Sequence, residues 1–233
     1  MSFYLHQDEM VRAWAVQFAA EDRKTATNYL GDFVRLARED KSQIVRLYLA
    51  SAMQRLPVDD RWGVIEALSQ RAEDAGDHNI PLMVWYAAEP LVAKDAEKAL
   101  KLGENSKLPK LLSFTVRRAG ALNTPEAFAA ITRSLTRVTL DTQRLDILNG
   151  LSSALQGQRK VAAPRGWSEV EASLGGSPNA AVRSLVQSLS LTFGSSQALA
   201  SLRKTLMDGT ADAAARRAAF DSLLAAKDGG LPP

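Results

Sequence analysis

A histidine stands among three acidic residues in the first half of the chain, and this group has the composition of a metal site. Glu73, Asp74 and Asp77 lie just before His78, and imidazole and carboxylate groups are common metal ligands. The same residues can instead form a helix start, because carboxylates accept hydrogen bonds from first-turn N–H groups and Pro81 suits that turn. Since no second histidine is nearby, we predict a helix start without metal ligands and keep His78 as a candidate interaction residue.

Two aromatic residues follow in the same stretch. Trp85 and Tyr86 can form a docking surface, because large aromatic side chains are enriched where proteins bind one another. At helical spacing they can equally pack in a core. Tyr86 aligns with Trp14 and Tyr48 when the chain is compared with itself. This alignment predicts a ladder of aromatic core residues that includes Tyr86 and leaves Trp85 as the freer of the two.

Glu89 follows one turn later. A carboxylate with a raised pKa can act as a general acid or base. It can also form an ion pair with Arg117 or Arg118, and this structural role is favoured because no histidine or nucleophile lies at a nearby helical position. The candidate interaction residues are therefore His78, Trp85 and Glu89, with no catalytic residue among them.

Four arginines occupy equivalent places in recurring motifs, and they are Arg12, Arg46, Arg183 and Arg216. Arginines in a column on one face can neutralise the phosphates of a nucleic acid. In stacked helical repeats such an arginine can instead pair with an acidic residue of the neighbouring repeat. The acidic residues in position to form such pairs are Asp8, Asp40 and Asp212. We favour this structural role over nucleic-acid binding.

The rest of the sequence lacks the motifs of several common active sites. There is no P-loop, no Gly-x-Gly-x-x-Gly fingerprint and no Gly-x-Ser-x-Gly elbow. His6 and His78 are the two histidines and there is no cysteine, so the residues of a histidine triad or a CxxCH haem attachment are missing.

The net charge of +3 is too small to indicate nucleic-acid binding by itself. No apolar run reaches the roughly 18 residues that a membrane span needs. We predict a non-catalytic segment without a cofactor of its own.

Apolar residues recur at helical spacing throughout, and alternating strand patterns are nearly absent, which predicts an all-α protein. Asp8, Ser42 and Thr124 have the character of N-caps. The first expected helix would bury Val11, Trp14, Ala15 and Phe18. Besides one helix beginning at Asp59, the expected helices lie at about 9–20, 25–38, 42–55, 79–93, 95–103, 108–121, 124–137, 140–156, 167–174, 178–193, 195–207 and 211–227.

A short motif recurs within this helical pattern. Val11-Arg12-Ala13-Trp14-Ala15 is followed 34 residues later by Val45-Arg46-Leu47-Tyr48-Leu49, and Val182-Arg183-Ser184-Leu185 is followed 33 residues later by Ala215-Arg216-Arg217-Ala218. The motif resembles that of the HEAT repeat, in which stacked helix pairs bury a continuous core. We expect a right-handed α-solenoid of about seven HEAT-like hairpins, open at both ends. Repeats would occupy 1–156 and 167–233, joined by an irregular loop or hinge at 157–166. Because polar capping repeats are lacking, we expect a segment of a longer protein.

One stretch is distinctive enough to suggest a family. Asp77–Leu91 reads Asp-His-Asn-Ile-Pro-Leu-Met-Val-Trp-Tyr-Ala-Ala-Glu-Pro-Leu. It resembles part of the large multidomain haem-binding, membrane-bound dehydrogenase-like proteins of the planctomycete and verrucomicrobial type. The resemblance covers about residues 8–120, and the other phrases that carry it are Val11–Ala15, Glu21–Arg23, Val45–Ala52, Gln54–Pro57 and Arg61-Trp62.

The resemblance implies a context for the chain. In that family a sugar-dehydrogenase-like β-propeller usually precedes the helical repeats and a c-type cytochrome domain follows them. This chain would then be a scaffold or protein-interaction segment of an exported or periplasmic redox protein, with the flanking domains as its partners and haem c in the parent protein. The alternative from the residues alone is a HEAT-like protein that binds nucleic acid through the arginine column.

Overall fold

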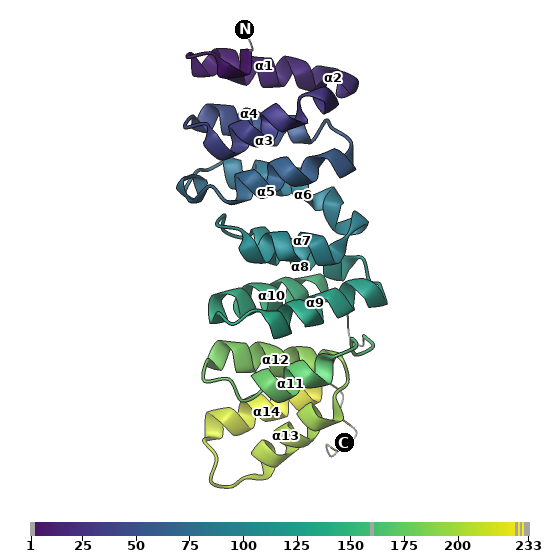
Figure 1. Cartoon of the computed structure of the whole chain (residues 1–233). Coiled ribbons are helices and arrows are strands. Elements are labelled where there is room, and N and C mark those ends of the chain that lie inside the picture. The colour runs from purple at the N-terminus through teal and green to yellow at the C-terminus, as the bar shows by residue number, and fades with distance from the viewer. Residues whose placement is uncertain (1–2, 159–160, 227, 229, 231–233) are drawn as a thin grey trace. The chain divides into compact units, whose positions relative to one another are not determined.

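The computed structural model describes residues 3–158, 161–226, 228 and 230, apart from the side chains of residues 23–25. Throughout this part the secondary structure is helical, with fourteen α-helices, three short 3-10 helices and no β-strand (Figure 1). The prediction of an all-α protein is confirmed. None of the helices in these described ranges is long and apolar enough to cross a membrane.

The chain forms two compact units, Met1–Leu122 and Asn123–Pro233. The sequence had suggested an irregular loop or hinge at 157–166. In its described residues that segment is irregular, as expected, and it lies inside the second unit. Residues 159–160 lie outside the described ranges, and the role of the segment as a hinge stays a prediction.

The first unit consists of two layers of helices, each layer packed in chain order. One layer contains α1, α4, α6 and α8, and the other contains α3, α5 and α7. Consecutive helices of opposite layers also pair, as α3 does with α4, α5 with α6, and α7 with α8. The elements of this unit are η1 (Phe3–Leu5), α1 (Glu9–Glu21), α2 (Arg23–Asn28), α3 (Leu30–Glu39), α4 (Gln43–Met53), η2 (Val58–Arg61), α5 (Trp62–Ser69), η3 (Ala72–Asp74), α6 (Ile80–Lys94), α7 (Ala96–Asn105) and α8 (Leu111–Ala121).

Most of the core of the first unit is one apolar cluster whose members run from Tyr4 to Leu111. Phe33, Leu49 and Ile65 are fully buried within it. A buried arginine connects the end of α4 with α6: Arg61 donates to the carbonyls of Leu56 at 2.8 Å, Gln54 at 3.1 Å and Ala87 at 3.3 Å. Hydrogen bonds of this kind let a charged side chain be buried at tolerable cost.

Helix starts follow local side-chain chemistry. The side chains of Asp8, Ser42 and Thr124 each accept a hydrogen bond from a first-turn N–H, which confirms all three predicted caps. Asp95 and Ser195 cap α7 and α13 in the same way. These caps set where each helix begins, and hence the register of every residue that the helix carries.

Two expectations for the N-terminal helices were wrong. The single helix expected at 25–38 is broken into α2 and α3 at Tyr29, whose ring packs on Tyr4 at 5.2 Å. In α1 the exposed residues include Trp14 and Phe18, whereas the inward face is formed by Ala13, Val16, Ala19 and Ala20. Small side chains let α1 lie close to its neighbour α4, and this rotates the large aromatic rings outwards.

In the second unit the helices pack against helices that lie one or two places away in chain order. α9 contacts α10 and α11, α12 contacts α10, α11 and α13, and α13 pairs with α14. Trp167 lies at the start of α11, only 2% exposed, with its ring against Phe193. The elements are α9 (Pro125–Arg137), α10 (Asp141–Ala154), α11 (Trp167–Leu174), α12 (Ala180–Thr192), α13 (Ser196–Met207) and α14 (Ala213–Ala225).

Candidate functional site

The recurring arginines occupy one register position. Arg12, Arg46, Arg183 and Arg216 are each the fourth residue of their helix, in α1, α4, α12 and α14. Three of them fold back onto the loop before their own helix. There the guanidinium donates to a carbonyl six residues earlier, that of His6 for Arg12, Asp40 for Arg46 and Ser177 for Arg183. The arginine of this motif therefore stabilises the start of its own helix by fixing the preceding loop.

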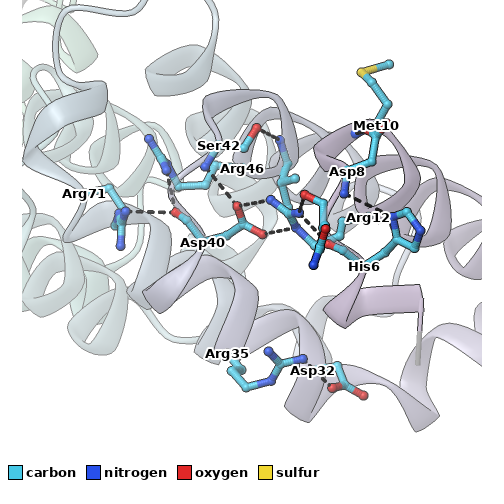
Figure 2. A network of polar contacts seen from close by, with 12 residues as sticks. His6, Asp8, Met10, Arg12, Asp32, Arg35, Asp40, Ser42, Arg46 and Arg71 are labelled. Atoms are coloured by element: carbon cyan, nitrogen blue, oxygen red, sulfur yellow. Dashed lines mark hydrogen bonds and ion pairs between the residues drawn. The ribbon is translucent and has the colours of Figure 1, made fainter. Parts of the chain in front are cut away.

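In the first unit two of these arginines also reach an acidic residue 28 positions ahead. Arg12 donates to both carboxylate oxygens of Asp40, at 2.6 Å and 2.9 Å. Asp40 also accepts from the Ser42 N–H, and its carbonyl accepts from Arg46 and Arg71, as Figure 2 shows. Because Asp40 ends α3 and Arg12 belongs to α1, this bidentate pair holds successive parts of the unit together.

The second such pair is almost completely removed from solvent. Arg46 donates to both carboxylate oxygens of Asp74, and the Nη2–Oδ1 distance is 2.6 Å. The side chains are 1% and 0% exposed. Gln43 adds a hydrogen bond of 3.3 Å to the same carboxylate. Burial disfavours the charged guanidinium, but the hydrogen bond and the charge of Asp74 outweigh it, so the pKa of Arg46 is raised.

The acidic partners of the arginines were predicted only in part. Asp40 is one, as expected, whereas Asp8 accepts from the Met10 N–H at the start of its own helix. Asp74, which the sequence had placed in a carboxylate cluster, is the partner of Arg46. The arginine in α14, Arg216, donates to the carbonyl of Leu206 rather than to the expected Asp212 carboxylate.

The cluster around His78 is dispersed in the structure. Asp74 binds Arg46, Glu73 pairs with Arg71, and Asp77 accepts from the N–H groups of Ile80 and Asn79, both at 2.8 Å. These backbone hydrogen bonds lower the pKa of Asp77. His78 is exposed. Among the described residues no three His, Cys, Asp or Glu side chains are placed to hold a metal ion.

The other two candidates, Trp85 and Glu89, line one surface groove. It lies between α6 and α8 and has a volume of about 430 Å³. The predicted ion pair of Glu89 is confirmed, with Arg118 as the partner. The groove, which we call the α6–α8 groove, is lined by Leu82, Trp85, Tyr86, Glu89, Phe114, Arg117, Arg118 and Ala121.

The roles expected for Trp85 and Tyr86 are reversed. Trp85 is partly buried, packs against the core and contacts the ring of Phe114 at 5.6 Å. Tyr86 is 52% exposed. Trp14 and Tyr48 do contact one another, with ring centroids 6.0 Å apart, but Trp14 is exposed and the predicted ladder of core residues is not formed. Position in the helix pair, which the alignment of motifs did not resolve, determines which of two adjacent aromatic residues faces inwards.

An exposed apolar surface extends over α1, α4 and α6, on the layer that also carries the groove. Its members are Met10, Trp14, Phe18, Ile44, Tyr48, Leu82 and Tyr86, and we call it the aromatic face. Tyr48 is partly buried and the other six residues are exposed. Sequence reasoning assigned most of these residues to the core, because their helical spacing is that of a buried stripe. Within it the ring of Trp14 contacts those of Phe18 and Tyr48, and clustered apolar exposure commonly marks a binding surface.

Acid is expected to weaken the ion pair between Arg12 and Asp40, which together with the pair Arg46–Asp74 we call the arginine clasps. Burial disfavours the Asp40 carboxylate, but hydrogen bonds from Arg12 and the Ser42 N–H outweigh it and lower its pKa. A pKa that is lower in the folded chain means that the stabilisation is complete above about pH 4 and is lost as the pH falls through the folded-state value. Urea unfolding at a series of pH values should show this loss, and Asp40→Asn should flatten it while costing about 1.5–3 kcal/mol at neutral pH.

Asp32→Asn is the matched control, because Asp32 pairs with Arg35 at the surface of the same helix. Its pH dependence should follow that of the parent chain. An Asp40→Asn variant with an unchanged acid slope would contradict the assigned role of Asp40.

The two sites differ in what they can do. The arginine clasps are occupied by carboxylates and backbone carbonyls and hold the fold together. The α6–α8 groove combines aromatic rings with guanidinium groups at the surface, which suits the recognition of another molecule. No protein-family model, curated protein or solved structure matches this chain.

Proposed function

We propose that this chain is a HEAT-like scaffold that binds other protein domains through the aromatic face. The parent protein would be an exported redox protein with a dehydrogenase-like propeller and a c-type cytochrome domain, and these domains would be the partners. The chain itself would carry no catalysis. It has no cysteine to attach haem c, so the haem would belong to the cytochrome domain.

The repeat character is supported by recurring geometry. The fourth-residue arginine recurs in α1, α4, α12 and α14, and in the first unit it reaches the acidic residue of the next helix pair. The two layers of that unit, each packed in chain order, are the arrangement that a stack of about seven hairpins in a right-handed solenoid requires.

The observation that carries the binding function is the exposed aromatic face. Trp14 is 45% exposed, Phe18 62% and Tyr86 52%. Large aromatic residues in solvent cost solubility unless a partner covers them, and they are enriched among the residues that dominate binding energy. No comparable observation favours the nucleic-acid alternative, because Arg12 and Arg46 already bind Asp40 and Asp74.

The reading frame around this segment provides the first test. Propeller strands encoded before it and a CxxCH motif after it are the expected result. A complete frame without either domain would overturn the redox context but not the binding function.

The binding function predicts that the double variant Trp14→Ser, Tyr86→Ser loses affinity for the flanking domains. The two rings lie on α1 and α6 and are exposed, so their removal should weaken binding by about tenfold or more. Calorimetric titration with separately expressed propeller and cytochrome domains measures this change. Thermal unfolding checks that the variant is folded.

Leu140→Ser, Phe220→Ser is the matched control, since both residues are exposed apolar side chains of the second unit. It should bind as tightly as the parent chain. Equal affinities for all three proteins, or no binding by the parent, would refute the role of the aromatic face.

A further inference from the structure

We propose that the α6–α8 groove binds an acidic amphipathic segment of a partner protein, with an apolar side chain on its aromatic floor and a carboxylate on Arg117. This inference rests on the proposed function as a protein-binding scaffold and names the chemistry of one partner.

The floor of the groove is apolar and preformed. Trp85 and Phe114 are partly buried, with ring centroids 5.6 Å apart and an interplanar angle of 55°. Leu82 and Tyr86, which are 39% and 52% exposed, provide further apolar surface. Rings held against one another lose little freedom when a further side chain packs on them, so this floor suits a leucine or an aromatic residue.

The charges of the groove point to an acidic partner. Arg118 is already paired with Glu89, so these two charges offset one another. The guanidinium of Arg117 is exposed and, within the described residues, has no hydrogen bond or ion pair. The lining therefore has one positive charge in excess. The hydroxyl of Tyr86 also has no partner in the described part of the chain, which leaves a second donor next to the apolar floor.

These donors fit a carboxylate better than a phosphate. One guanidinium can bind a carboxylate through two parallel hydrogen bonds. Phosphopeptide sites use clusters of arginines, whereas here Arg118 is already paired with Glu89. The carboxylate of Glu89 would also repel a doubly charged phosphate. The groove also has exposed walls at Leu82 and Tyr86, whereas pockets for small molecules enclose most of the ligand. A protein segment is therefore the favoured occupant.

Fluorescence anisotropy with three labelled model peptides tests the proposal. The first is a short helix-forming peptide of Leu, Ala and Glu, the second has Lys at each Glu position, and the third has phosphoserine there. The Glu peptide should bind about tenfold or more tightly than the Lys peptide, because the Lys peptide has no anionic group to pair with Arg117. It should also bind more tightly than the phosphoserine peptide, and the opposite order would reassign the groove to phosphorylated segments and overturn the proposal.

Two variants locate the binding. Arg117→Gln should weaken binding of the Glu peptide about tenfold and abolish its advantage over the Lys peptide. Arg38→Gln removes the same charge from the exposed end of α3, on the other layer, and should leave both unchanged. Equal effects of the two variants, or no binding of the Glu peptide, would refute the proposal. Failure here leaves the flanking-domain titration of the aromatic face unaffected, so the two proposals fail separately.

Discussion

Asp74→Asn is expected to lower the free energy of unfolding of the first unit by about 3–5 kcal/mol. The substitution preserves the shape of the side chain, removes its charge and replaces one acceptor oxygen by an amide donor. Arg46 is 1% exposed, and the carboxylate of Asp74 is its only acidic hydrogen-bond partner among the described residues. Without it, a guanidinium stays buried with no carboxylate bonded to it. The amide of asparagine also adds a donor at a site where two donors of Arg46 and one of Gln43 already point.

Hydrogen exchange by mass spectrometry measures this effect directly. Peptides from α4 and α6 should lose protection, because the clasp joins α4 to the turn that precedes α6. Urea unfolding followed by the fluorescence of Trp14, Trp62 and Trp85, all in the first unit, gives the magnitude.

Two comparisons separate charge burial from simple packing. Asp32→Asn breaks an ion pair whose side chains are 37% and 34% exposed, and it should cost less than about 1 kcal/mol. Replacing both members of the buried pair, by Arg46→Met with Asp74→Leu, should restore stability close to that of the parent. A cost below about 1 kcal/mol for Asp74→Asn would show that the pair is not the buried clasp described here.

Trp167→Ala is expected to lower the free energy of unfolding of the second unit by a similar amount, about 3–5 kcal/mol. The indole is 2% exposed and packs edge-on against Phe193 with centroids 4.7 Å apart. Its N–H donates to the hydroxyl of Ser190 at 2.9 Å. The substitution opens a cavity and leaves that buried hydroxyl without its donor. Hydrogen exchange of peptides from α11 and α12 is the measurement, since no tryptophan is then left in this unit.

Ser190→Ala separates the hydrogen bond from the packing. It keeps the ring in place and leaves only the indole N–H unpaired, so it should cost about 1–3 kcal/mol. Leu140→Ala, at a 61% exposed position of the same unit, should change stability by less than about 0.5 kcal/mol. A Trp167→Ala variant as stable as Leu140→Ala would contradict the placement of Trp167 in the core.

The clasps bear on the proposed function because they position the binding surface. Arg46 and Asp74 connect α4 with the turn that leads into α6, which carries Tyr86 and one wall of the groove. A surface that is already rigid loses less entropy on binding. We therefore infer that the buried ion pairs serve the interaction surface indirectly, by keeping its helices in register.

Much of the local structure was predictable from the residues. The caps at Asp8, Ser42 and Thr124 and the pairing of Glu89 with Arg118 were correctly predicted. Each depends on a short-range rule, such as a polar side chain at a helix start or opposite charges on helices expected to be adjacent. The repeated Val-Arg motif likewise marked one register position in four helices.

These short-range rules do not predict which residues pair when they lie far apart in the sequence. Asp74 meets Arg46 from 28 residues away, whereas the sequence grouped it with the acidic residues near His78 and assigned it no partner. Spacing along the chain identifies candidates for a pair, but which carboxylate arrives depends on how the next helix pair is placed.

The amino-acid sequence alone determined that this chain is all-α, where most helices begin and which arginines share a register. Only the tertiary structure decided which sides of those helices are buried. Trp14, Phe18 and Tyr86 look like core residues in the sequence, yet they are exposed. In α1 a mainly alanine face is buried instead, and in α6 the buried face is formed by residues such as Ile80, Val84 and Leu91. Helical periodicity defines an apolar stripe, but adjacent positions on a helix differ by only about 100°, so the neighbouring helix selects the face. That selection placed Trp85 in the floor of the groove and Tyr86 on its exposed wall.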